Sequence, residues 1–321
     1  MADKTHISWT DATWSPVTGC TKVSPGCENC YIERTPPFRM AHKRFDGDGI
    51  GATTGVMLHP ERLEQPLKWR KPRRIFVCSM ADLFHDDVPD EYIAQVWAVM
   101  ALAPQHTFQV LTKRHARMRS LLTSVAFHIQ VMLAVWERVD RPGIKMPLPN
   151  VWLGVSAEDQ KRADLRIPKL LDTPSAVRFV SAEPLLGPVR LCHCVHPNFG
   201  GDGPEIDCPL HGAVKLDWLI VGGESGPKAR PMHPDWARSL RNQCTTAGVA
   251  FHFKQWGAHI PRDHTYGLYG GMRDVTLAGD WSMFDPTRTD GAVTMVSFVK
   301  RHHGRELDGR TWDEYPAVRH G

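Results

Sequence analysis

Short runs of apolar and β-branched residues recur along the chain, and each is followed by a polar turn and a longer stretch with helical periodicity. After the first clear run, apolar residues repeat at i, i+3, i+4 and i+7 over Ile93–Met100, which predicts a helix that opens at Pro89. A long amphipathic stretch is predicted over Leu121–Val139, and a further helix over Pro234–Ala247 with Gly248 as its stop. The strand-like runs lie at residues 74–79, 108–111, 151–155, 177–180, 218–221 and 249–253.

The spacing of these runs predicts the fold class. These runs begin roughly 27 to 43 residues apart with a helix-like stretch between them, which is the spacing of βαβ units with parallel strands. Two weaker runs, at residues 15–18 and 56–58, would bring the number of strands to eight. Near-continuous apolar runs indicate strands that are buried on both faces. We predict an α/β fold, a (βα) barrel with six to eight parallel strands; the alternative is a doubly wound open sheet.

Polar residues follow nearly every predicted strand. Because parallel strands all end on one face, these residues are expected to converge on a common site at the mouth of the barrel. Any single polar strand end is ordinary for a loop, and only the repetition favours a site. The candidates for binding a cofactor or substrate are Asp82, Thr112, Lys113, Ser156, Glu183, Glu224 and Lys254.

Three cysteines follow the first predicted strand. Cys20, Cys27 and Cys30 are spaced as C-x6-C-x2-C, and Ser24–Gly26 supplies a turn between the first two. Three thiolates can hold three irons of a 4Fe–4S cluster and leave the fourth iron open to another ligand. The alternatives are a zinc-stapled loop, a loop without metal, and a dithiol pair at the C-x-x-C half.

A second group of possible ligands lies late in the chain. Cys192, Cys194, Cys208 and His211 could form a tetrahedral zinc site that staples an insert at residues 190–212, although the four residues could equally hold no metal. We assign residues 1–257 to the barrel, with this insert, and residues 258–321 to a C-terminal extension packed on it.

Several motifs resemble a known family. Taken together they are similar to the phage- and prophage-associated three-cysteine-motif family, which is radical-SAM-like. The resemblance runs from about His6 to Gly257 and resumes at Leu307–Asp313. The motifs that carry it are Trp14–Tyr31, Ser79–His85, Leu111–Arg114, Ser181–Gly187 and Gly222–Gly226.

At one remove, an Asp after one strand and a Thr-Lys after the next are similar to spore-photoproduct-lyase-like radical SAM enzymes. This resemblance implies that the predicted barrel is of radical SAM type. It also implies that Cys20, Cys27 and Cys30 bind the cluster and that strand-end residues face S-adenosylmethionine (SAM) or substrate. Two features depart from the common radical SAM pattern, which is C-x3-C-x2-C with a hydrophobic residue before the last cysteine. Here six residues separate the first two cysteines, and Asn29 precedes the third.

Composition and charge indicate the class of protein, its cellular location and its possible partners. A hydrophobic content of 42% and a charged content of 23% are those of a globular protein. The N-terminus carries no apolar leader and no apolar run approaches eighteen residues, so we expect a cytoplasmic protein without a membrane partner. The net charge is +4, and the basic run Lys68–Arg74 either contacts nucleic-acid phosphates or is a solvated turn.

Two functions are compatible with these observations. In the first, the cluster reduces SAM, and a 5′-deoxyadenosyl radical modifies or repairs a nucleic-acid-related substrate. In the second, the protein is a non-catalytic phage accessory protein that binds a host or phage protein or a nucleic acid. The sequence leaves the oligomeric state open.

Overall fold

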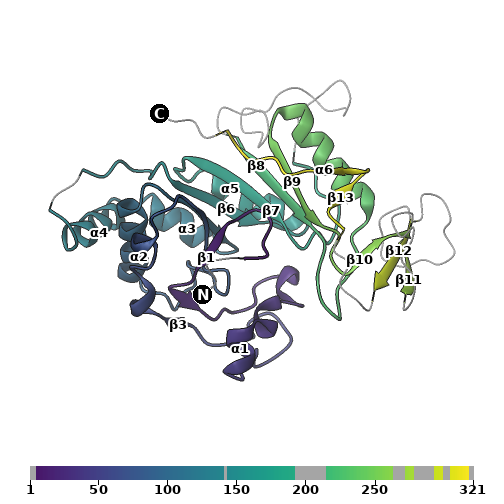
Figure 1. Ribbon diagram of the computed structural model, residues 1–321, viewed down its shortest axis with the longest axis horizontal. Helices are drawn as coiled ribbons and strands as arrows, with labels where there is room; N and C mark the ends of the chain where they lie inside the picture. The colour runs from purple at the N-terminus through teal and green to yellow at the C-terminus, as the bar shows by residue number, and fades with distance from the viewer. Residues whose placement is uncertain are drawn as a thin grey trace. The chain divides into compact units, whose positions relative to one another are not determined.

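The computed structural model describes residues 5–140, 143–191, 215–262, 272–277, 293–298 and 304–317 (Figure 1). The chain divides into two compact units. The first unit comprises Met1–Glu28, Ile32–Ser156 and Leu165–Phe179, and the second comprises Asn29–Tyr31, Ala157–Asp164 and Val180–Gly321.

The largest sheet contains seven strands in the order β1-β4-β5-β6-β7-β8-β9. Their bounds are β1 Ala12–Trp14, β4 Arg74–Val77, β5 Thr107–Thr112, β6 Val151–Ser156, β7 Val177–Ala182, β8 Trp218–Gly222 and β9 Ala250–Gln255. In the first unit β1, β4, β5 and β6 pair in parallel, and in the second β8 pairs in parallel with β9. Every residue of β6 and β8 is buried, as expected for strands covered on both faces. The predicted α/β class is confirmed; within the described residues the strand order does not show a closed ring.

Two expected strands are not part of this sheet. The runs at 15–18 and 56–58 correspond to β2 (Val17–Thr18) and β3 (Met57–Leu58), which pair antiparallel in a separate ribbon. The extended backbone stops after β2 because Gly19 adopts a φ of 90°, and Met57 is half exposed, unlike a residue of a doubly covered strand. The first strand of the large sheet is β1 instead, where Trp14 is fully buried.

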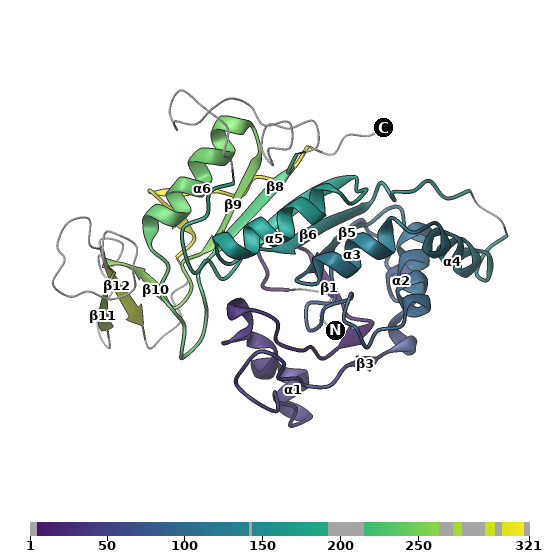
Figure 2. The same ribbon diagram turned by 180° about the vertical axis from the view of Figure 1, so that it is seen from behind.

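The helices largely follow the predicted periodicity. α2 begins after Pro89, its residues Ile93, Val96, Trp97 and Met100 are buried, and the helix packs against α4. The C-cap of α6 is Gly248 in the left-handed conformation. α6 packs along β9 in the second unit (Figure 2). The helices are α1 Pro36–Met40, α2 Asp90–Leu102, α3 His115–Leu122, α4 Val125–Trp136, α5 Gln160–Leu171 and α6 Pro234–Ala247. Short 3₁₀ helices lie at Pro25–Cys27, Tyr31–Arg34, Pro60–Arg62 and Pro66–Lys68.

The predicted amphipathic stretch at 121–139 is divided between two helices. Ser124 lies between α3 and α4, and its hydroxyl accepts a hydrogen bond from the Phe127 amide at 3.4 Å, which caps α4. The two helices meet at a bend of 73°. Among the described residues no single helix has the length and hydropathy needed to cross a membrane, although this bent pair meets the criterion when its two helices are taken together.

The C-terminal segment of the second unit adds small antiparallel sheets. It also returns to β8 and β9, because the Trp218 indole donates to the Glu314 carbonyl at 2.8 Å and the Phe253 amide donates to the Trp312 carbonyl at 2.9 Å. The motif at 307–313 therefore lies beside the end of the large sheet. The strands of these small sheets are β10 His259–Pro261, β11 Met272–Leu277 and β12 Val293–Phe298, and β13 Glu306–Leu307 with β14 Arg310–Thr311.

Candidate functional site

In the first unit, Asp82 organises the carboxyl ends of β4 and β5. Its side chain is buried, and one carboxylate oxygen, Oδ1, accepts hydrogen bonds from the Thr112 hydroxyl at 2.7 Å and the Phe84 amide at 3.0 Å. The other oxygen accepts from the Lys113 amide at 2.9 Å. A carboxylate that receives three donors is held in one orientation and ties the two strand ends together.

The same set extends to β6 through Lys113. Its ammonium donates to the Ser156 hydroxyl at 3.3 Å, and the buried Ser156 carbonyl accepts from Arg166 at 2.8 Å. Four of the predicted site residues, Asp82, Thr112, Lys113 and Ser156, are therefore joined by hydrogen bonds, as expected for strands that end on one face.

His85 connects this set to the cysteine loop and was not among the predicted residues. Its amide donates to the Asp82 carbonyl at 3.0 Å. Because its Nδ1 accepts from the Asp87 amide, its Nε2 carries the proton and donates to the Thr21 hydroxyl at 2.8 Å. Burial and the Arg114 charge lower the pKa of His85, so its imidazole is neutral at pH 7. The signal was its place in the Ser79–His85 motif.

The loop that carries Cys20 is held by its backbone. The Cys20 amide donates to the Thr54 hydroxyl and its carbonyl accepts from the Thr54 amide, both at 3.0 Å. A Cβ on Gly19 would lie 1.7 Å from the Gly55 carbonyl oxygen, so only glycine fits beside Cys20. The second cysteine, Cys27, is buried at the end of a 3₁₀ helix.

The cysteines of the described residues are all thiols. Cys20, Cys27, Cys30, Cys78 and Cys244 form no disulfide. Burial raises the pKa of Cys78 and of Cys244 far above the ordinary thiol value, which suits small core residues and not ligands. In the described part of the chain, no three or more His, Cys, Asp or Glu side chains are grouped as a metal site.

In the second unit, Glu224 has a full set of donors. Its carboxylate accepts from the Arg230 amide at 2.8 Å, from Arg230 Nε at 2.9 Å and Nη2 at 2.6 Å, and from the Asn29 amide group at 3.0 Å. Asn29 also donates to the Lys228 carbonyl at 2.8 Å. Glu224 thus anchors Asn29, the residue that immediately precedes Cys30. Neither Arg230 nor Asn29 was among the site residues predicted from the sequence.

Two further predicted residues of the second unit pair with one another. Lys254 and Glu183 form an ion pair at 2.8 Å, and Glu183 also accepts from the Ser181 hydroxyl at 3.1 Å. A Cβ on Gly222 would lie 2.7 Å from a Glu183 carboxylate oxygen, so glycine at the end of β8 makes room for this side chain. The proposed zinc ligands Cys192, Cys194, Cys208 and His211 lie outside the described residues.

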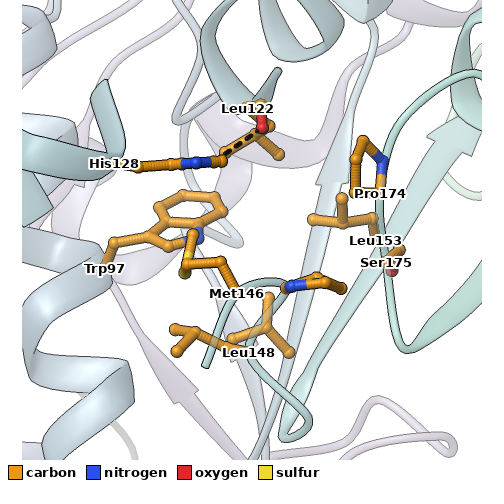
Figure 3. A pocket seen from close by; sticks show the side chains of 10 residues that line it. Trp97, Leu122, His128, Met146, Leu148, Leu153, Pro174 and Ser175 are labelled. Carbon is orange, nitrogen blue, oxygen red and sulfur yellow. Dashed lines mark hydrogen bonds between the residues drawn. The ribbon is translucent and has the colours of Figure 1, made fainter. Parts of the chain in front are cut away.

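One cavity of the first unit, of about 350 Å³, lies away from these residues (Figure 3). It is lined mainly by apolar side chains, with Trp97 and Met146 facing it and His128 donating to the Leu122 carbonyl at 2.9 Å. Val151 begins β6, so this cavity lies at the amino end of the strand, whereas Ser156 ends it. It includes none of the predicted site residues.

The chain is thus a mixed α/β protein with hydrogen-bonded polar strand ends. A family model described as "Protein of unknown function (DUF5131)" matches residues 4–316, and the chain belongs to this family. Comparison of the chain with the curated proteins and with the solved structures found no match.

Proposed function

We propose that this protein is a radical-SAM-like iron–sulfur protein with a barrel of that type. Cys20, Cys27 and Cys30 would hold a 4Fe–4S cluster, and the polar strand ends would bind SAM. The observation that supports this most directly lies within the first unit. Thr21, next to Cys20, receives a hydrogen bond from His85, whose amide in turn bonds Asp82. The cysteine loop and the strand-end residues are therefore one connected set.

The donor chemistry fits the cluster. Three thiols are the ligands that a cubane with one open iron requires, and none of the three is consumed by a disulfide. The described residues show no preformed metal-holding group, so the position of the cluster is part of the proposal. When bound, such a cluster supplies the electron for reductive cleavage of SAM.

The chain's own residues would position the ligand. Asp82 fixes the Thr112 hydroxyl and the Lys113 backbone, which directs the Lys113 ammonium toward Ser156. A fixed ammonium beside a hydroxyl suits the carboxylate of an amino acid such as the methionyl part of SAM. Pre-organised donors of this kind bind without the cost of ordering them first.

The cluster is tested by metal content. After anaerobic reconstitution with iron and sulfide, the wild-type protein is expected to be brown, to bind about four irons and to cleave SAM in the presence of a reductant. Cys20→Ala, Cys27→Ala and Cys30→Ala should each lose most of the iron, because three-point ligation tolerates no loss. Cys244→Ala is the matched control, since this thiol is fully buried. A colourless protein, or one tightly held zinc at the three cysteines, would end the proposal.

A nucleic acid is the substrate class we propose. A cavity of about 350 Å³ in the first unit is lined by Arg34, Arg39, His42, Lys43 and Arg44, with Glu33 and Phe38. The Glu33 carboxylate is occupied by the Phe45 amide at 2.6 Å. A concave surface with this excess of cations suits a phosphate backbone. The run 68–74 offers less, because Arg74 is paired with Asp11 and Arg73 stacks on Trp69.

Salt-dependent binding separates the two basic regions. The triple variant Arg39→Glu, Lys43→Glu and Arg44→Glu is expected to weaken binding of a fluorescent single-stranded oligonucleotide at least about tenfold and to reduce its salt dependence. Lys68→Glu, Arg70→Glu and Lys71→Glu form the matched control, with an expected change below about twofold. Fluorescence anisotropy measures both. The reverse ranking, or no binding by the wild type, would refute this substrate class.

A further inference from the structure

Arg114 is a partly buried arginine, and two of its guanidinium nitrogens are buried without a hydrogen-bond partner among the described residues. It follows Lys113 at the carboxyl end of β5 and precedes α3. Its Nε and Nη1 atoms are buried and have no hydrogen-bond partner among the described residues. Its backbone amide is satisfied by the Thr112 hydroxyl at 2.8 Å, so the deficit belongs to the side chain alone.

Such a group is unusual because a guanidinium stays charged at every pH at which the protein is folded. Buried polar groups are almost always hydrogen-bonded, and a desolvated cation without a counter-charge is destabilising. The neighbouring His85 does not compensate, because its imidazole is committed to the Asp87 amide and the Thr21 hydroxyl. The carboxylate of Asp82 likewise faces Thr112, Lys113 and Phe84.

The next arginine along the chain, Arg117, has a structural role and can be compared with Arg114. Arg117, on α3, donates to the carbonyls of His85 and Val88 and pairs with Asp90. Its donors are used to join α3 to the segment that leads into α2. Arg114 makes no such connection through its Nε or Nη1 atoms within the described residues.

We infer that Arg114 binds an oxyanion of the protein's ligand, a phosphate or a carboxylate group, at the carboxyl end of β5. Guanidinium donors are the side-chain groups that best match both anions. The Lys113 ammonium, one residue away, adds positive charge to the same strand end. The site requires no iron, so it can be tested apart from the cluster.

The experiment compares Arg114→Met with Arg117→Met in the full chain by thermal unfolding. In chloride buffer, Arg114→Met is expected to raise the Tm by a few degrees, because it removes two buried donors that have no partner among the described residues and replaces them with an unbranched apolar side chain. Arg117→Met is expected to lower the Tm, because it leaves two carbonyls and Asp90 without their donor. A drop in Tm for Arg114→Met as large as that for Arg117→Met would show a structural arginine and overturn the inference.

Anion titrations at constant ionic strength supply the second readout. Inorganic phosphate, acetate or both are expected to raise the wild-type Tm in a saturable way, and the more effective anion identifies the ligand group. The shift should vanish in Arg114→Met, persist in Arg117→Met, and require about tenfold more anion in Arg114→Lys, which keeps the charge and loses the planar donor set. No saturable shift in the wild type, or equal shifts in wild type and Arg114→Met, would overturn the inference.

Discussion

Replacing Asp82 with asparagine is expected to lower the free energy of unfolding by about 3 kcal/mol. The reason is the number and type of its partners. All three are donors, namely the Thr112 hydroxyl and the amides of Phe84 and Lys113. An asparagine amide places an NH₂ group against at least one of them, so a buried donor faces a buried donor. Asp82 as a whole is only 6% exposed, so water cannot relieve the mismatch.

Urea unfolding measures this effect, and Asp86→Asn is the matched control. Asp86 is exposed and lies four residues along the same loop, so its substitution should change the free energy of unfolding by less than about 0.5 kcal/mol. The slope of the unfolding free energy against urea should be the same in both variants, which shows that only stability has changed. A loss below about 1 kcal/mol for Asp82→Asn would mean that the network contributes little to the fold.

The parallel part of the fold was predictable because the signal is local. β8 contains no polar side chain, β6 contains none before its last residue, Ser156, and both strands are buried along their whole length. Once such runs are recognised as parallel strands, the carboxyl ends must share one face, and the contacts among Asp82, Thr112, Lys113 and Ser156 follow from that geometry.

The ribbon of β2 and β3 was not predictable in the same way. Two-residue strands contain too little pattern to separate a sheet strand from a short ribbon. The first strand of the large sheet, Ala12–Trp14, has only three residues, and its burial depends on partners far along the chain, such as the Arg62 carbonyl that accepts from the Trp14 indole. The local sequence at residues 12–14 does not encode such a partner.

The hydrogen-bond and ion-pair partners of the candidate residues could not be predicted from the sequence either. Glu183, Glu224 and Lys254 were recognised as charged strand-end residues, but a charge in a sequence does not reveal whether it faces a ligand or another side chain. In the structure Glu183 pairs with Lys254, and Glu224 pairs with Arg230. The same ambiguity hid Arg114, which reads as one more basic residue until its buried, unsatisfied Nε and Nη1 atoms are located.

Glu224→Gln is expected to lower the free energy of unfolding by about 3 to 5 kcal/mol. The substitution removes the negative charge of a buried ion pair and leaves the Arg230 guanidinium without its counter-charge. The Glu224 side chain is 5% exposed and that of Arg230 is 20% exposed.

Burial acts to raise the pKa of Glu224, but the donors of Arg230 and Asn29 outweigh it, and the pKa lies below the usual 4.5. A carboxyl with a lowered folded pKa stabilises fully above its unfolded pKa and loses this contribution as the pH falls through the folded value. The difference between wild type and Glu224→Gln should therefore be constant near pH 7 and shrink below about pH 4.5.

The second consequence of losing Glu224 concerns the cysteine loop, because Asn29 precedes Cys30 and donates to this carboxylate at 3.0 Å. In Glu224→Gln the Cys30 thiol is expected to react several-fold faster with a thiol reagent than in the wild type, because Arg230 no longer holds the acceptor in place. Asn29→Ala should raise the same rate while costing only about 1 to 2 kcal/mol of stability, since the two hydrogen bonds of one neutral amide group are removed and the ion pair with Arg230 stays. Glu306→Gln, an exposed glutamate of the same unit, is the control and should change neither quantity. If Glu224 serves only to bind a ligand, Glu224→Gln should fold with nearly wild-type stability and leave Cys30 reactivity unchanged, which would contradict the anchoring role assigned to it.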